Sequence, residues 1–242
     1  MSLKNRIAMV TGAGGGIGKE ICLSLAKEGA KIILFGGRNI DKLKTCAEEI
    51  RALGASCSLY CGDITNDATR EDLFNKAMLE HGELDVLINN AGVAHNELFE
   101  STSKETFDNI MNINVRAPYM LTQLAIPYLK KSNRASIINL SSVVAHAGYA
   151  GQSAYVASKH ALLGFTKSLA SEVYKDGIRV HAVSPGGVYT DMVKVSRPDL
   201  TPDGMIMPNE IADIVMFLLK NRGNAVIDEV LVHRLNKEPF LV

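Results

Sequence analysis

Tyr155 and Lys159 stand four residues apart, and their types and spacing suit proton chemistry. If their segment is helical, the two side chains share a face, with about 5–6 Å between their Cβ atoms. A free tyrosine has a pKa of about 10, and a nearby ammonium group lowers that pKa because it favours the phenolate. Such a pair can give a proton to a substrate oxygen or take one from it. Taken alone, the same spacing is typical of an ordinary surface pair on a helix.

Two polar residues that precede this pair extend the pattern. Ser142, the second of two consecutive serines, follows an apolar run and can hold a carbonyl oxygen by a hydrogen bond. A serine after a strand is also a common turn or helix-cap residue. Asn114 falls in a helix-like stretch, where its amide can simply bond the backbone. It is the joint occurrence of the four residues that favours catalysis of a reaction at a carbonyl or alcohol group.

The stretch Thr11–Gly18 is rich in glycine and joins an apolar run to a helix-like pattern. Gly12 permits a tight turn, Gly16 lets the backbone approach a pyrophosphate, and Gly18 allows the helix to pack closely on the strand. The start of such a helix presents free N–H groups and a partial positive charge to phosphates. The stretch therefore predicts a dinucleotide site, with a purely structural strand–helix turn as the alternative. Its glycines read G-x-x-x-G-x-G, whereas the usual dinucleotide fingerprint reads G-x-G-x-x-G.

Short apolar or β-branched runs alternate with longer helical patterns along the 242 residues. Several runs are apolar throughout, which suits a parallel sheet covered on both faces. The alternation predicts βαβ units, and hence an α/β, Rossmann-like, doubly wound sheet of seven parallel strands in a single domain over residues 1–242. The predicted strands are Ile7–Val10, Lys31–Phe35, Ser56–Tyr60, Val86–Asn89, Ser136–Leu140, Arg179–Val183 and Glu229–Val232.

The order and spacing of these motifs resemble the short-chain dehydrogenase/reductase family in its short, single-domain form. The resemblance extends along nearly the whole chain and weakens at the C-terminus. There the sequence is similar to a subgroup of NADP-dependent reductases that act on hydroxy acids and assorted carbonyls. Tyr155 follows Ser142 by thirteen residues, which is the family's usual separation. The matching segments are Thr11–Gly18, Asn89–Gly92, Asn112–Val115, Ser141-Ser142, Tyr155–Lys159 and Pro185–Thr190.

The resemblance implies roles for four catalytic residues. Tyr155 acts as general acid in reduction and general base in oxidation, and Ser142 holds the substrate oxygen. Lys159 sits beside the tyrosine and also reaches the nucleotide ribose. Asn114 holds a water that links Lys159 to solvent. The cofactor supplies the hydride, and no metal is expected.

The glycine turn and the resemblance together predict the residues that bind the nucleotide. Asp63, after the third predicted strand, matches the family residue that contacts adenine. The full set is Gly12, Gly15, Gly16, Ile17, Gly18, Arg38, Asp63, Ile64, Asn90, Ala91, Gly92, Tyr155, Lys159, Pro185, Gly186, Val188 and Thr190.

The end of the second predicted strand bears on which nicotinamide nucleotide is used. An acidic residue there would bind the ribose hydroxyls of NAD and repel a 2′-phosphate. The sequence has no acid at this place, and Arg38 can make charge-assisted bonds to the phosphate. NADP(H) is therefore favoured, with NAD(H) as the second candidate. Gly15 stands where many NADP-preferring relatives carry a basic residue, and the pair Gly36-Gly37 makes this turn one residue longer than usual.

The predicted function is hydride transfer between NADP(H) and a carbonyl or secondary alcohol, with a 3-oxoacyl group, a hydroxy acid or another ketone as substrate. A non-catalytic nucleotide sensor and a nucleotide-sugar epimerase or dehydratase are the alternatives. Residues 190–208, including the proline-rich Ser196–Pro208, form a candidate substrate lid. Further candidates for substrate contact are His95, His146, Tyr149, Arg197, Met205 and Met207.

Composition argues against other classes of function. The formal net charge is zero, which indicates neither nucleic acid nor an anionic membrane as a partner. We see no run of 18 or more apolar residues and no signal-peptide pattern. The four cysteines lack metal-site spacing, so we expect reduced thiols in a cytoplasmic protein. By analogy with relatives, helices near Phe107–Lys131 and Ser153–Lys175 predict a homodimer or homotetramer.

Overall fold

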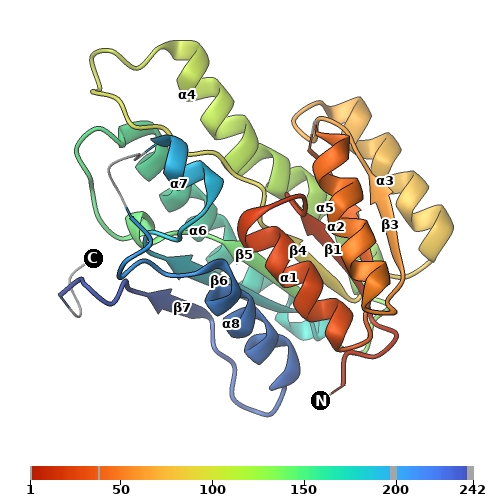
Figure 1. Ribbon diagram of the computed structural model, residues 1–242. Coiled ribbons are helices and arrows are strands. Elements are labelled where there is room, and N and C mark those ends of the chain that lie inside the picture. Colours follow the sequence, from red (N-terminus) through yellow and green to blue (C-terminus); the bar gives the residue numbers. More distant parts are fainter. Residues whose placement is uncertain (1, 38, 197–200, 239–242) are drawn as a thin grey trace.

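The structure, a computed structural model, describes residues 2–37, 39–196 and 201–238. Within these residues, seven parallel strands form one sheet in the order β3-β2-β1-β4-β5-β6-β7 (Figure 1). The strands are β1 (Ile7–Thr11), β2 (Lys31–Phe35), β3 (Cys57–Tyr60), β4 (Val86–Asn89), β5 (Ser136–Leu140), β6 (Arg179–Pro185) and β7 (Glu229–Val232). The predicted fold class, a Rossmann-like doubly wound sheet, is confirmed.

Helices and helical turns connect the strands and cover both faces of the sheet (Figure 1). The α-helices are α1 (Gly16–Lys27), α2 (Ile40–Ala52), α3 (Asp67–His81), α4 (Lys104–Met111), α5 (Ala117–Leu129), α6 (Ser153–Val173), α7 (Asp191–Ser196) and α8 (Pro208–Lys220). Three shorter helical turns are η1 (Asn112–Arg116), η2 (Val143–Ala145) and η3 (Tyr174–Asp176).

The apolar runs become strands because both of their faces are buried. All five residues of β1 are buried, and alternate side chains enter two different cores. Val10 points into the core under α1, α2 and α8, whereas Met9 points into the core under α3, α5 and α6. A strand buried on both sides needs apolar residues at every position, which is what these sequences supply.

The strand order places a reversal between β1 and β4. β1 pairs with β2 on one side and with β4 on the other, so the chain winds outward in both directions from this point. In open parallel sheets, ligands bind at the carboxyl ends of the strands where the order reverses. The turns after β1 and β4, Thr11–Gly18 and Asn90–Val93, meet at this edge.

The structure corrects three predicted strand bounds by a few residues. β1 continues to Thr11, which pairs with Phe35, and β6 continues to Pro185, which pairs with Val232. β3 begins at Cys57 rather than one residue earlier. In β1 and β6 the neighbouring strands therefore extend the ladder beyond the apolar runs, because pairing depends on the partner strand and not only on local residue type.

Among the residues that the structure places, no helix is long and apolar enough to cross a membrane.

Candidate active site

Tyr155 and Lys159 lie in the first turns of α6, on the same face, as their spacing predicts. The Lys159 Nζ atom is 5.7 Å from the centre of the Tyr155 ring. The same ammonium group donates a hydrogen bond of 2.8 Å to the carbonyl oxygen of Leu140, the last residue of β5. Lys159 is 5% exposed, and the tyrosine ring is half-buried. The helix thus sets both groups against the carboxyl end of β5.

Ser142 lies beside them because it caps the helical turn η2 directly after β5. Its Oγ accepts a hydrogen bond from the Val144 amide and donates one to the carbonyl oxygen of Pro185, both at 3.3 Å. The serine side chain also forms a hydrogen bond with Tyr155. Ser142, Tyr155 and Lys159 therefore converge where β5, β6 and α6 meet.

Burial changes the proton affinity of both titratable groups. It lowers the pKa of Lys159 to about 8, because a buried ammonium loses hydration. Burial raises the pKa of Tyr155, and the bond with Ser142 offsets only part of this rise. The prediction that the lysine lowers the pKa of Tyr155 is wrong for the protein without bound nucleotide. The pKa of Tyr155 is raised there, with burial as the largest cause. The lysine ammonium is also held at the Leu140 carbonyl.

Asn114 lies in η1, a π-helical turn between α4 and α5, and is 1% exposed. Its amide accepts from the Val93 N–H at 2.8 Å and donates to the Val93 carbonyl at 2.9 Å. It also donates to Ser158 Oγ at 3.0 Å. The π-turn and the asparagine together tie the loop after β4 to α6. A water held by this side chain stays a prediction.

The glycine turn and the turn after β4 interlock. The Thr11 hydroxyl accepts hydrogen bonds of 3.0 Å from the N–H groups of Asn90 and Ala91. The Asn90 side-chain amide donates back to the Thr11 carbonyl at 2.9 Å. A Cβ atom on Gly18 would lie 2.3 Å from the Gly12 carbonyl oxygen, so only glycine permits this approach.

This turn has the features of a dinucleotide cradle. Gly15 stands at the N-cap of α1 without a side-chain cap. Apart from its two chain neighbours, none of the described residues has an atom within 4 Å of the place where its Cβ would be. The first N–H groups of α1 are therefore open to a phosphate. A Cβ on Gly16 would lie 3.1 Å from Thr190, which brings the segment after β6 to the same cradle. The residues present thus fit a bound dinucleotide.

The predicted adenosine end lies at the carboxyl ends of β2 and β3. Gly36 has φ +78°, and a Cβ there would lie 2.6 Å from Ile64, so the extra glycine accommodates this contact. Asp63 accepts hydrogen bonds from the backbone and hydroxyl of Thr65, at 3.0 and 2.6 Å. Arg38, the predicted ligand of the 2′-phosphate, lies outside the described residues.

The segment after β6 leads from the site into the candidate lid. The Gly186 N–H bonds the Val232 carbonyl at 2.8 Å, and Val188 is buried and bridges to Ile206. The lid range 190–208 begins with the short helix α7 and closes where α8 starts at Pro208. Its described parts are residues 190–196 and 201–208, so Arg197 falls outside them.

The two histidine candidates are each bound to a carboxylate. His95 lies 2.9 Å from Glu97, and His146 lies 2.7 Å from Glu229 on β7. Tyr149 is 38% exposed in the loop before α6. In the lid, Met205 is buried whereas Met207 is 39% exposed.

The chain after β7 packs on the lid, a contact that no sequence motif indicates. Arg234 lies against Gly187 and places Nη1 3.2 Å from the Met205 sulfur. Asn236 packs on Gly204, where a Cβ would lie 2.8 Å from its amide nitrogen. Only the tertiary structure reveals this packing. Over the chain as described, no three His, Cys, Asp or Glu side chains gather as metal ligands.

The fold and these side chains define a nucleotide-dependent oxidoreductase of the Rossmann type. The chain matches the family described as short chain dehydrogenase over residues 6–201. It therefore belongs to the short-chain dehydrogenase/reductase family of NAD(P)-dependent oxidoreductases.

Individual relatives cover nearly the whole chain. The 3-oxoacyl-[acyl-carrier-protein] reductase FabG of Thermotoga maritima is 33% identical, over 96% of this chain and 97% of its own. The acetoacetyl-CoA reductase of Cupriavidus necator is 35% identical, over 89% and 91%. A metagenomic short-chain oxidoreductase solved in complex with NADP superimposes with a TM-score of 0.85, at 31% identity, covering 98% of this chain and 100% of that one.

Proposed function

We propose that the protein transfers a hydride between NADP(H) and a carbonyl or secondary alcohol, with Tyr155 as the proton carrier. The observation that carries this proposal is the convergence of Ser142, Tyr155 and Lys159 at the carboxyl end of β5. This edge of the sheet also holds the open glycine turn. A nucleotide held by the glycine turn would thus have its hydride at the same edge of the sheet as the proton donor.

Each of the four side chains has a separate role in the proposed reduction. Ser142 holds the substrate oxygen, and the phenol of Tyr155 donates a proton to it. Lys159 stabilises the phenolate that remains, because an ammonium next to it favours the charged form. Asn114 fixes the loop after β4 against α6 and so keeps the lysine in position. A bound nicotinamide nucleotide supplies the hydride.

The residues proposed to bind the nucleotide belong to turns at the carboxyl edge of the sheet and to α6. Gly12, Gly15, Gly16, Ile17 and Gly18 would hold the pyrophosphate at the start of α1. Asp63 and Ile64, together with the predicted ligand Arg38, would bind the adenosine, and Asn90, Ala91 and Gly92 in the turn after β4 would also contact the nucleotide. The nicotinamide half would lie against Tyr155, Lys159, Pro185, Gly186, Val188 and Thr190.

We favour NADP(H) over NAD(H) because the turn after β2 carries Arg38 and no acid. The metagenomic relative solved with NADP is consistent with this preference. NAD(H) is the second candidate, since Gly15 leaves no basic side chain in the glycine turn.

A 3-oxoacyl thioester is the first substrate class to test. Two relatives that span most of the chain are reductases of 3-oxoacyl and acetoacetyl thioesters by name. The proposed pocket walls are the loop after Gly92, the segment Val143–Gln152 and the lid, residues 190–208. A hydroxy acid or another ketone is the alternative substrate.

Exposed apolar side chains support a homodimer or homotetramer. The rings of Tyr119 on α5 and Phe165 on α6 lie in a tilted contact with centroids 4.8 Å apart, and Tyr119 is 46% exposed. A second apolar surface is an open groove between α8 and β7, lined by Ile214, Phe217 and Leu231. A single domain over residues 1–242 and a cytoplasmic location remain predictions.

A substrate panel tests the proposed function. The purified chain is incubated with NADPH, and in parallel with NADH, together with acetoacetyl-CoA, a 2-oxo acid or a cyclic diketone. We expect nucleotide oxidation with at least one ketone, and a higher kcat/KM with NADPH. An equal or higher kcat/KM with NADH contradicts the preference. If the chain binds nucleotide but turns over no ketone or alcohol, the result favours the alternative function, a non-catalytic nucleotide sensor. The presence of all four catalytic residue types argues against that alternative.

A further inference from the structure

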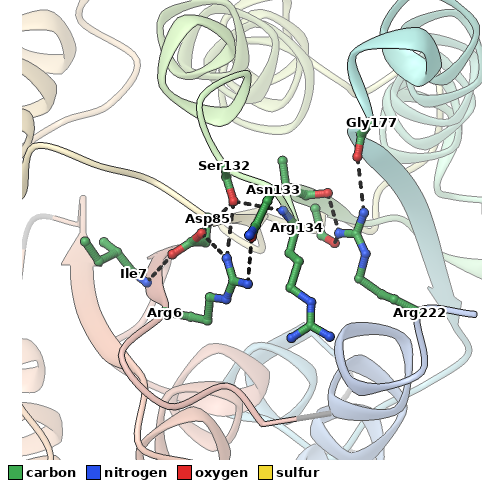
Figure 2. Close-up of polar contacts among 10 residues, drawn as sticks. Arg6, Ile7, Asp85, Ser132, Asn133, Arg134, Gly177 and Arg222 are labelled. Carbon is green, nitrogen blue, oxygen red and sulfur yellow. Dashed lines mark hydrogen bonds and ion pairs between the residues drawn. The ribbon is translucent and has the colours of Figure 1, made fainter.

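Four arginines gather at the edge of the sheet opposite the glycine turn. Arg6 precedes β1, Arg134 precedes β5, Arg179 opens β6, and Arg222 follows α8. Because the strands are parallel, their amino ends meet at one edge. We call these four residues the basic cluster. Three of them are drawn in Figure 2.

Asp85, the carboxylate that pairs with Arg6, has both of its oxygens occupied (Figure 2). Its Oδ1 accepts from Arg6 at 2.6 Å and from the Ser132 hydroxyl at 2.5 Å. Its Oδ2 accepts from the Ile7 N–H at 2.9 Å. The charge of Asp85 therefore balances Arg6, and the other arginines of the basic cluster keep their positive charge.

Arg222 is held by neutral groups. Its guanidinium donates to the carbonyl of Ala135 at 2.6 Å, to the Ser136 hydroxyl at 2.8 Å and to the Gly177 carbonyl at 3.1 Å. Among the described residues, the charged groups that act on it are the other three arginines of the basic cluster. Burial, and then repulsion by these arginines, lowers the pKa of Arg222 to about 10. The group is still charged at neutral pH, in a positive field.

Arg134 has a half-buried side chain that lies between Arg6 and Arg222 in Figure 2. Its backbone N–H bonds Ser132 Oγ at 3.2 Å. Within the part of the chain that the structure describes, its guanidinium has no hydrogen-bond acceptor and no ion-pair partner. Five N–H donors thus point into a region where positive charge already accumulates.

We propose that the basic cluster binds a phosphate dianion, with Arg134 as its direct ligand and Arg6 and Arg222 beside it. A planar guanidinium matches two oxygens of a phosphate, and the dianion would relieve the repulsion among the arginines. Arg6, Arg134 and Arg222 lie side by side in a compact group (Figure 2), which fits a compact oxyanion better than an extended acidic partner. The ligand would be inorganic phosphate or a phosphomonoester.

Such a site would stabilise the fold rather than take part in hydride transfer. The bound anion would join the amino ends of β1 and β5 with the chain after α8. The glycine turn and Tyr155 are at the other end of the strands, so the site is independent of the proposed function.

Thermal unfolding at constant ionic strength tests the proposal. The wild-type chain, Arg134→Gln and the control Arg51→Gln, which changes an exposed arginine on α2, are each melted with sodium chloride, sodium phosphate or glycerol 3-phosphate. We expect a phosphate-specific rise in Tm of roughly 2–4 °C for the wild type and for Arg51→Gln. The rise should be lost in Arg134→Gln. For each variant, the Tm with the phosphate compound is compared with the Tm of the same variant in sodium chloride. Differences in stability between the variants therefore do not affect the result.

The two anions distinguish the sources of the ligand. A rise with both indicates a general phosphate site, and a rise with glycerol 3-phosphate alone indicates a phosphomonoester site. No rise with either anion, or an equal rise in Arg134→Gln, overturns the proposal, because the anion would then bind elsewhere, such as the glycine turn. Turnover of Arg134→Gln on the best ketone should stay within about twofold of wild type.

Discussion

At the scale of single residues, Lys159 links burial to chemistry. Its 5% exposure lowers its pKa from 10.5 to about 8, whereas burial raises the pKa of Tyr155. The phenol therefore stays protonated throughout the range in which the lysine loses its charge. The lysine pattern was visible in the sequence, but the direction of the tyrosine shift was not, since burial depends on the folded surroundings.

This difference predicts the pH dependence of ketone reduction. In the folded chain Lys159 is charged below about pH 8 and neutral above it, whereas in the unfolded chain it would stay charged up to 10.5. Between these values the unfolded chain binds more protons than the folded chain, so the contribution of Lys159 to the free energy of unfolding rises with pH. The reductase activity should fall over the same range, because the charged lysine is lost. We expect kcat/KM for reduction to drop about tenfold per pH unit above pH 8. A flat profile up to pH 10 would refute this role for the lysine.

At the scale of elements, the glycine turn is predictable in position but not in its contacts. The motif Thr11–Gly18 predicted a strand, a tight turn and a helix, and the structure has all three. The hydrogen bond from the Asn90 side chain to the Thr11 carbonyl joins two turns 79 residues apart, and no local sequence pattern predicts it. The same holds for the buried pair Asn89 and Asn139, which bond each other across β4 and β5 at 2.8 Å.

Replacing Gly18 by alanine tests the close packing of α1 on β1. The new Cβ would lie 2.3 Å from the Gly12 carbonyl oxygen and 2.5 Å from the Asn90 amide. Overpacking of this kind costs about 1–3 kcal/mol in the free energy of unfolding. Urea denaturation measures this loss, and nucleotide titration should show weaker binding.

Gly164→Ala is the matched control. Gly164 lies inside α6, and among the described residues no atom from outside its own stretch of helix lies within 4 Å of the added Cβ. Alanine should therefore stabilise the chain by about 0.5–1 kcal/mol. Equal stability of the Gly18 and Gly164 variants would show that α1 does not pack tightly on the Gly12 carbonyl in solution.

At the scale of the whole molecule, the sheet order explains why the sequence could predict the edge of the sheet at which the site lies. Four motifs lie at the carboxyl end of a strand, so a parallel sheet brings them together whatever their separation along the chain. They are Thr11–Gly18, Asn89–Gly92, Ser141-Ser142 and Pro185–Thr190. Substrate selection does not follow from this rule. It depends on how the lid, residues 190–208, packs, and the contact of Arg234 with Met205 comes from a tail without a motif.

Sedimentation velocity tests the assembly that the exposed apolar side chains favour. We expect a dimer or tetramer for the wild type, and a smaller species for Phe107→Glu or Phe217→Glu, because burying the new charge is costly. These side chains are 43% and 51% exposed. The control Leu79→Glu changes a residue on α3 that is 88% exposed, and it should leave the assembly unchanged. A monomeric wild type would refute the assembly.

The measurement that tests the central claim most directly is turnover of Tyr155→Phe, which removes the hydroxyl and keeps the ring. With the best ketone of the panel and saturating NADPH, we predict a loss in kcat of about 10²–10⁴-fold, while the Kd for NADPH stays within about twofold. Tyr174→Phe, at a residue 63% exposed just after α6, should keep the wild-type rate. A Tyr155→Phe variant that retains near-full kcat would contradict the account, because the proton would then come from another group.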